Sequence, residues 1–282
     1  MAFSSDSYQV AVHYVSDDEL LRYIEVMMAR FHPQSYSFAN TAMLKLKNKI
    51  NADIMTDAWP DFSCTVIKLP NSEVKLAINL FFSESPEKLE KLLSSPKFKD
   101  STLIAVLDDE TARQLRGMKI SWPCGLKENV LLTYKTLYFP GKLSDLPKWS
   151  CPEDVIVSTL KSDHAKVICG SWNYCELPDR IKYFEYLIKN CNSVGVFLKS
   201  DISKPVSWAV LANYGHIIHI HTVQEHRRKG YSRIVMLNLM KQMLEVGMTP
   251  ILEISEKNTA SVQLNTSLGL VELFGSSWKL YS

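Results

Sequence analysis

The sequence predicts an α/β protein with a mixed sheet of the α+β kind. Strand-like apolar runs alternate with stretches of helical periodicity along the whole chain. Apolar residues make up 46% of the 282 residues and charged residues 22%, which is typical of globular domains with ample cores. Near residue 230, a strand-like run passes through a basic loop with one glycine into a long amphipathic helix.

The chain is expected to divide near residue 145. Residues 142–153 carry Pro147 and Pro152 and show little periodicity. We therefore expect an N-terminal α/β domain at 1–145 and a C-terminal domain at 146–282. No internal repeat or low-complexity tract is present.

The N-terminal half begins with a weakly alternating strand at 8–15, followed by a helix. Ser16 and Glu19 form a capping box for this helix, and His32-Pro33 ends it. The further elements expected, in order, are a hairpin of strands 64–69 and 74–82, a helix opening at Pro86, a strand at 102–107, a helix at 110–118 and a strand at 130–138. The acidic pair Asp108-Asp109 could serve a metal or acid/base site, but an N-cap and first-turn role for the helix at 110–118 is favoured.

The C-terminal half is expected to begin with helices at 154–172 and after Asp179, the second with Ile181, Phe184, Leu187 and Ile188 facing inward. Asn258 is a helix N-cap, and Gly247 a left-handed helix stop. The remaining expected elements are strands at 193–199 and 206–213 joined by a turn at 203–205, a strand at 217–222, a helix at 232–246, a strand at 251–255, a helix from 258 to 267, and a hairpin of 270–274 with 278–281.

The basic loop Arg227-Arg-Lys-Gly-Tyr-Ser232 has the features of an anion site. The first amides of a helix have no internal partner and carry the positive end of the helix dipole, and Gly230 permits close approach of a phosphate. A single glycine excludes both the P-loop and the dinucleotide-binding fingerprint. A solvated basic helix start is the alternative.

Composition excludes several other functions. The net charge of +2 provides no general field for nucleic acid. The six cysteines show no metal-ligand spacing, so we expect no metal, and they suit a reducing compartment. No apolar run approaches the ~18 residues that would span a membrane. Residues 1–7 show neither a secretory signal nor the early arginines of a typical mitochondrial presequence.

The loop resembles the Arg/Gln-x-x-Gly-x-Gly/Ala signature of the GNAT acyltransferase superfamily, with Ser232 at the last position. Three segments, in the same order and at similar separations, are similar to the animal glycine N-acyltransferase family: Trp59-Pro-Asp-Phe62, Lys204-Pro-Val-Ser-Trp208 and Gln224-Glu-His-Arg-Arg-Lys-Gly230. The resemblance covers most of the chain. It implies a C-terminal GNAT fold whose fourth and fifth strands splay around coenzyme A, after an N-terminal domain that could be a degenerate copy of that fold.

The resemblance also implies site residues. Glu225 stands where the family has its general base; the alternative is a surface carboxylate paired with Arg228 or Lys229. The residues expected at acyl-CoA are Thr222, Val223, Arg227, Arg228, Lys229, Gly230, Tyr231, Ser232 and Asn258. His219 and His221 are alternative bases or water-holding groups, although structural histidines are favoured, and His226 is expected to point away. Asn265 occupies the position of the GNAT tyrosine acid and cannot act as that acid.

The predicted function is therefore transfer of an acyl group from CoA to the amino group of glycine or a similar amino acid. The alternatives are an acetyltransferase for another amine and a catalytically silent CoA-binding protein. Expected partners are the small-molecule substrates, with neither nucleic acid nor membrane, and the chain is expected to be a monomer. The resemblance implies a mitochondrial location, and the cytoplasm is the alternative.

Overall fold

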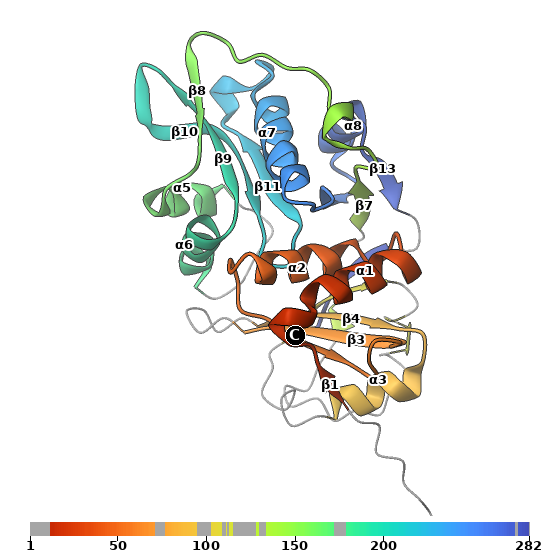
Figure 1. Cartoon of the computed structure of the whole chain (residues 1–282). Coiled ribbons are helices and arrows are strands. Elements are labelled where there is room, and N and C mark those ends of the chain that lie inside the picture. Colours follow the sequence, from red (N-terminus) through yellow and green to blue (C-terminus); the bar gives the residue numbers. More distant parts are fainter. Residues whose placement is uncertain are drawn as a thin grey trace, which may run out of the picture.

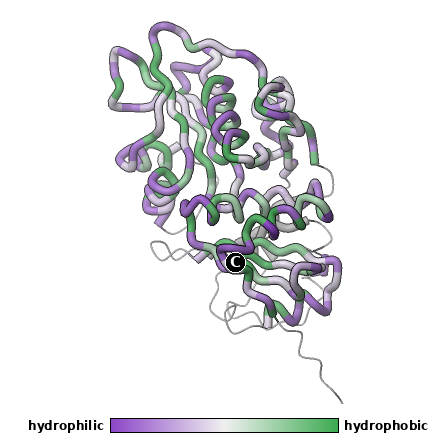
Figure 2. Tube along the Cα trace, viewed as in Figure 1, coloured by the Kyte–Doolittle hydropathy of each residue, from purple (hydrophilic) through white to green (hydrophobic). Residues whose placement is uncertain are grey.

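A computed structural model describes residues 12–70, 77–94, 103–108, 111, 113–114, 128–129, 134–171, 179–273 and 276–281. The described strands form three sheets, and helices α1 (Leu20–Arg30) and α2 (Tyr36–Leu46) lie between the two largest (Figure 1). Hydrophilic residues dominate the outer loops, whereas apolar and hydrophilic residues alternate along α7 (Tyr231–Glu245) (Figure 2). One cluster of buried apolar side chains contains residues of both halves, among them Met27, Ala42, Leu137, Ile217 and Leu252.

The first sheet confirms the predicted hairpin. Strands β3 and β4 pair antiparallel, whereas β4 and β5 are parallel. The predicted turn at 71–72, most of the strand predicted at 8–15 and most of the helix predicted at 110–118 lie outside the described residues. In spatial order the strands are β1 (His13–Tyr14), β2 (Asp53–Thr56), β3 (Cys64–Leu69), β4 (Ala77–Ser83), β5 (Leu103–Asp108), β14 (Ser276–Tyr281) and β6 (Glu128–Asn129).

Two helices of the N-terminal half begin as predicted, one after the Ser16–Glu19 cap and one at Pro86. The Glu19 carboxylate accepts hydrogen bonds from the Ser16 amide at 2.9 Å and the Ser16 hydroxyl at 2.7 Å. The sequence analysis missed α2, because eight of its eleven residues are buried and it shows no polar face. The helices are the 3-10 turn η1 (Asp17–Glu19), α1 (Leu20–Arg30), α2 (Tyr36–Leu46) and α3 (Pro86–Leu93).

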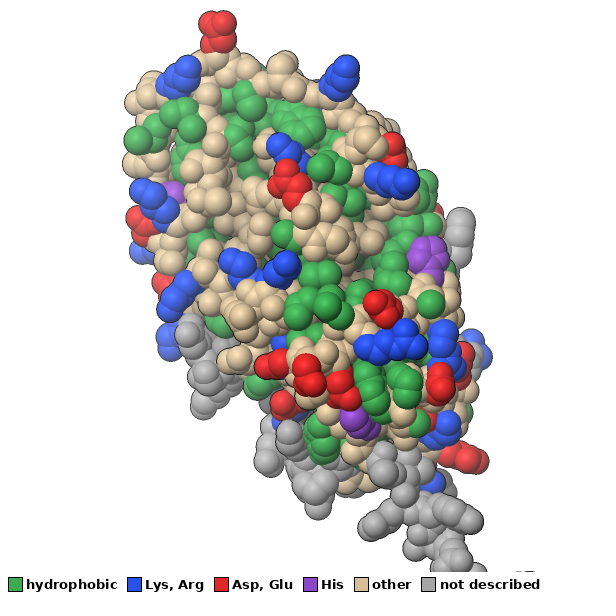
Figure 3. All heavy atoms as spheres, in the orientation of Figure 1, with side chains coloured by type: hydrophobic (Ala, Val, Ile, Leu, Met, Phe, Trp, Pro, Cys, Tyr) green, Lys and Arg blue, Asp and Glu red, His purple; other side chains and the backbone are tan. Residues whose placement is uncertain are grey.

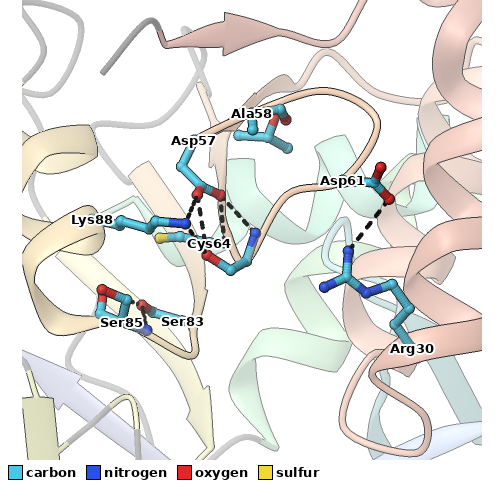
Figure 4. A network of polar contacts seen from close by, with 10 residues as sticks. Arg30, Asp57, Ala58, Asp61, Cys64, Ser83, Ser85 and Lys88 are labelled. Atoms are coloured by element: carbon cyan, nitrogen blue, oxygen red, sulfur yellow. Dashed lines mark hydrogen bonds and ion pairs between the residues drawn. The ribbon is translucent and has the colours of Figure 1, made fainter. Parts of the chain in front are cut away.

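The loop that carries Trp59-Pro-Asp-Phe62 is organised by the buried carboxylate of Asp57 (Figure 4). This carboxylate accepts hydrogen bonds from the amides of Ser63 at 2.8 Å and Cys64 at 2.7 Å and pairs with Lys88 Nζ at 2.8 Å. Burial opposes its ionisation, but these bonds outweigh burial and lower the pKa of Asp57. Phe62 is fully buried, so this segment is a structural element.

The second sheet has the order β11-β10-β9-β8, and it corrects three expectations. The predicted helix at 154–172 begins instead with strand β8, which pairs with β9. Ile181 is 42% exposed rather than inward-facing, and the turn expected at 203–205 lies at 199–200. The elements are β8 (Val155–Ser158), η4 (Ser162–His164), α5 (Ala165–Gly170), α6 (Arg180–Asn190), β9 (Ser193–Leu198), β10 (Asp201–Leu211), β11 (Ile217–Thr222), η5 (Gln224–His226) and α7 (Tyr231–Glu245).

The third sheet joins strands from both halves. β7 (Tyr134–Tyr138) lies between β12 (Ile251–Ser255) and β13 (Val271–Leu273), and α8 (Thr259–Ser267) follows β12. The predicted C-terminal hairpin is wrong, because β13 pairs with β7 while β14 pairs with β5 and β6 of the first sheet. Each half thus contributes a strand to a sheet of the other. The predicted division near residue 145, close to η3 (Leu143–Asp145), stays a prediction.

Helix α2 joins the chain segments that enter β11 and β12. Asn40 Nδ2 donates to the carbonyls of Gly215 at 3.0 Å and Thr249 at 2.7 Å, and Asn40 Oδ1 accepts from the Thr249 amide at 2.9 Å. Gly215 has φ +80°, and a Cβ at this position would lie 2.4 Å from Asn40 Cβ. One buried amide therefore fixes where both strands begin.

Replacing Asn40 should loosen both strand entries. Asn40→Ala removes three buried hydrogen bonds to backbone, so we expect the free energy of unfolding to fall by about 3 kcal/mol in urea denaturation. Asn238→Ala is the matched control, because its half-buried amide donates to the carbonyl of Ile234 within one helix. Equal losses in the two variants would contradict the role assigned to Asn40.

Candidate functional site

A cavity of about 400 Å³ lies between β11 and β12. Its walls include every residue from 217 to 221 and from 252 to 255. Successive strand residues point to opposite faces, so a cavity that meets them all runs along the strand edges. The two strands belong to different sheets and form no ladder with each other. An extended ligand with amide groups can therefore bond to these edges like an added strand.

The basic loop lies beyond the end of β11 and leads into α7. Arg228 has φ +65° and Gly230 φ +79°, so two of three successive residues are left-handed. A Cβ at Gly230 would meet nothing within 4 Å, which shows that backbone conformation, and not crowding, favours glycine here. Residues 227–230 are exposed, and the first turn of α7 has no acidic residue. This helix start is open to an anion.

Ser232 is part of a chain of three hydroxyl groups. Its Oγ lies 2.7 Å from Thr222 Oγ1, which lies 2.8 Å from Ser207 Oγ. The contacts join α7 to the end of β11 and to the middle of β10. The hydroxyl of Ser232 thus links the start of α7 to the sheet. Gly or Ala, the residues that the GNAT signature has at this position, could not make this contact.

Two of the residues expected at acyl-CoA line the cavity. Arg227 does so while its Nε donates to the carbonyl of Thr222 at 3.2 Å. Asn258 does so while its Oδ1 accepts from the Ser261 amide at 3.2 Å, which confirms the predicted N-cap. The other residues expected at acyl-CoA belong to the adjoining strand end, loop and helix start, and they lie outside the cavity lining: Thr222, Val223, Arg228, Lys229, Gly230, Tyr231 and Ser232.

Glu225 lies in η5, between the end of β11 and the basic loop. Its side chain is exposed and lies outside the cavity lining. Among the described residues it forms no ion pair with Arg228 or Lys229. The structure therefore leaves this carboxylate exposed, without the partial burial that would raise its pKa and help it act as a base.

The two histidines of β11 both line the cavity. A β-bulge lies between the pairs Trp208–His221 and Val210–Ile218, and His219 adopts φ +53° there. His219 Nε2 donates to the carbonyl of Ile168 at 2.7 Å, which makes this histidine structural. Burial lowers the pKa of His219 to about 4, and burial followed by the charge of Arg227 lowers the pKa of His221. Both rings are therefore neutral near pH 7.

Asn265 is buried on α8, and its Nδ2 donates to the carbonyl of Ser261 at 2.9 Å. It lies outside the cavity lining, as does His226. Neither residue supplies an acid to the gap between the strands.

One acidic residue that lines the cavity was not predicted from the sequence. Glu253, on β12, has a side chain that is 9% exposed, and its Oε1 is in close contact with His216 Nδ1. His216 Nε2 in turn contacts the hydroxyl of Ser37 on α2. The only sequence signal was one charged residue within the apolar strand Ile-Leu-Glu-Ile-Ser.

The described residues hold no group of three or more His, Cys, Asp or Glu side chains that could bind a metal. Within the same residues, no helix has the length and apolar character needed to cross a membrane.

Comparison with known proteins shows similarity over most of the chain. The family described as FR47-like protein matches residues 193–279. Human glycine N-acyltransferase-like protein 2 is 21% identical over 80% of this chain and 82% of its own length. Rat glycine N-acyltransferase is 22% identical over 89% of this chain and 92% of its own length.

Solved structures share the fold at low sequence identity. A Drosophila protein matches with a TM-score of 0.70 at 13% identity, over 95% of this chain and 98% of its own. A tandem GNAT protein from the clavulanic acid biosynthesis pathway matches with a TM-score of 0.51 at 11% identity, over 96% and 98%. The predicted α/β fold with a GNAT-type arrangement is confirmed, and so is the resemblance to glycine N-acyltransferases.

The depressed pKa of His219 predicts a pH dependence of stability. The unfolded chain binds a proton on this ring near pH 6.5, whereas the folded chain does so only near pH 4. Stability is therefore complete above pH 6.5 and is lost as the pH falls toward 4, by up to about 3 kcal/mol. His219→Gln should lose less stability than wild type between pH 6.5 and 4 in urea titrations. Parallel curves for the two proteins would refute the assignment.

Proposed function

We propose, from the chain's similarity to glycine N-acyltransferases, that this protein transfers an acyl group from CoA to the amino group of glycine or a similar amino acid. GNAT-type N-acyltransfer is supported by the relatives and by the fold. The observation that carries the finer proposal is the gap between β11 and β12, which adjoins the exposed amides at the start of α7.

Coenzyme A would enter as a substrate along two parts of this site. Its diphosphate suits the amides from about Arg228 to Ser232, where the positive helix end and Lys229 supply charge. Its pantetheine arm, which carries amides, suits the strand edges that line the cavity. Arg227 and Asn258 both line the cavity, Arg227 next to the basic loop and Asn258 at the start of α8. They would therefore lie between the diphosphate and the pantetheine arm.

The chemistry is a direct transfer within a complex of both substrates. The incoming ammonium loses a proton, the neutral amine attacks the thioester carbonyl, and the oxyanion then expels the CoA thiolate, while the second proton of the attacking nitrogen passes to that thiolate or to solvent. We assign the first step to Glu225, which lies outside the cavity lining and therefore takes the proton by way of solvent. Because Asn265 supplies no acid, the thiolate leaves unassisted, as a thiol with a pKa near ~8.5 permits.

A second candidate function is a CoA-binding protein without catalysis. The observation that favours it is the position of Glu225, which is exposed and outside the cavity lining. An acetyltransferase for another amine is a third candidate, which the acceptor panel described below separates from the first.

We further propose that the chain works as a monomer on small molecules, in the mitochondrion by resemblance alone. On the face drawn in Figure 3, acidic and basic side chains are interspersed over the N-terminal helices. Such a surface offers no extended basic field for nucleic acid.

The first test is product formation. Benzoyl-CoA and glycine should yield the N-acyl product by mass spectrometry, with free thiol released in equal amount. Glu225→Gln should retain CoA affinity while kcat falls roughly a hundredfold or more, since general base catalysis commonly contributes that factor. CoA binding without product from any of a panel of amines would instead support the non-catalytic candidate.

Arg227 provides a test of the CoA position. Arg227→Ala should raise the KM for acyl-CoA by an amount equivalent to about 1.5–3 kcal/mol at most, because a charged hydrogen-bond donor next to the diphosphate is lost. Lys241→Ala is the control, since Lys241 lies on α7, the helix that follows the loop of Arg227, and pairs with Glu245 at 3.7 Å. A KM that is unchanged in Arg227→Ala would place the diphosphate elsewhere.

A further inference from the structure

We propose that Glu253 binds the ammonium group of the acyl acceptor, and that His216 and Ser37 hold its carboxylate in position. The proposal rests on the function proposed above and adds a residue that receives the second substrate. It also gives the N-terminal half a part in that site, since Ser37 lies on α2.

The position of Glu253 follows from the strand entries. Gly215 and Thr249 both bond to Asn40, and each precedes its strand by two residues. The strands β11 and β12 therefore leave α2 side by side and run in the same direction. Glu253 is the middle residue of β12, and its contact with His216, which precedes β11, turns its carboxylate toward the α2 end of the gap.

The gap is long enough to separate the two substrates. The six residues of β11 extend over roughly 17 Å at about 3.3 Å per residue. At the far end, Arg227 and the α7 amides provide positive charge. At the α2 end, the cavity is lined by Tyr214, Ile217 and Glu253. A ligand anchored by its diphosphate at the positive end thus leaves the acidic end for another molecule.

The negative charge of Glu253 indicates which molecule binds at the α2 end of the gap. A carboxylate that is 9% exposed is costly unless a cation or hydrogen-bond donors compensate it. Acyl-CoA is anionic, and its thioester is neutral. Of the two substrates, only the amine carries a positive centre before it reacts. His219 and His221 are neutral near pH 7, so they do not compete for the carboxylate.

The carboxylate of Glu253 contacts His216, and His216 contacts Ser37 on α2. His216, whose side chain is 1% exposed, contacts Glu253 Oε1 through Nδ1 and the Ser37 hydroxyl through Nε2. The carbonyl of Ser37 accepts from Thr41 Oγ1 at 2.7 Å, which stiffens this turn of α2. Such support fixes the direction of a substrate-binding group, and it also makes Ser37 a positioning residue that need not touch substrate.

The test is a split between the kinetic constants of the two substrates. In Glu253→Gln, which keeps the shape and removes the charge, the apparent KM for glycine should rise roughly tenfold or more, with the KM for benzoyl-CoA unchanged. Ser37→Ala should raise the KM for glycine by a smaller factor. Glu272→Gln is the matched control, because Glu272 lies in the same sheet, outside the cavity lining, and pairs with Lys135 at 3.0 Å.

Equilibrium binding keeps the proposal separate from the function on which it rests. With a non-reactive thioether analogue of acyl-CoA bound, wild type should bind glycine more tightly than glycolate, which has a hydroxyl in place of the ammonium. Glu253→Gln should lose that preference. Absence of turnover with a retained, Glu253-dependent preference would reject catalysis and keep the amine site. An unchanged KM for glycine, or an unchanged preference, in folded Glu253→Gln would overturn the proposal.

Discussion

The gap between β11 and β12 depends on one buried side chain. The Asn40 amide bonds to the chain ahead of each strand, and Gly215 has to be a glycine because Asn40 packs directly against it. Two strands fixed at their entries by a third element need not pair with each other. Helix α2 therefore fixes the positions of β11 and β12. The unpaired edges of these two strands, which suit an amide-bearing ligand, follow from the position of this helix.

The site combines this opening with a helix start at one end and a carboxylate at the other. The hydroxyl chain Ser207–Thr222–Ser232 fixes the start of α7 to the sheet, and the Ser37–His216 pair orients Glu253. The positive and negative ends of the cavity are thus set by different elements. This separation of charge matches a reaction between an anionic thioester and an amine that is cationic before it reacts.

Local signals allowed much of this arrangement to be predicted from the sequence. Strands β3, β11 and β12, the cap at Asn258 and the stop at Gly247 are encoded by neighbouring residues. What failed depends on contacts between distant segments. Helix α2 is buried nearly all round and shows no amphipathic pattern, and β14 pairs with β5 instead of the nearer β13. The acidic end of the cavity was missed because its parts lie on β12, in the loop ahead of β11 and on α2.

The exchange of strands between the halves has a consequence for biosynthesis. The last described strand, β14, lies between β5 and β6 in the sheet of the N-terminal half. The strands made first must therefore wait, with that sheet incomplete, until residues 276–281 have left the ribosome. The edge of β5 is exposed to other chains during that interval, and an unpaired strand edge readily recruits foreign strands. Pairing of β14 with β5 is thus the step that closes this edge to foreign strands.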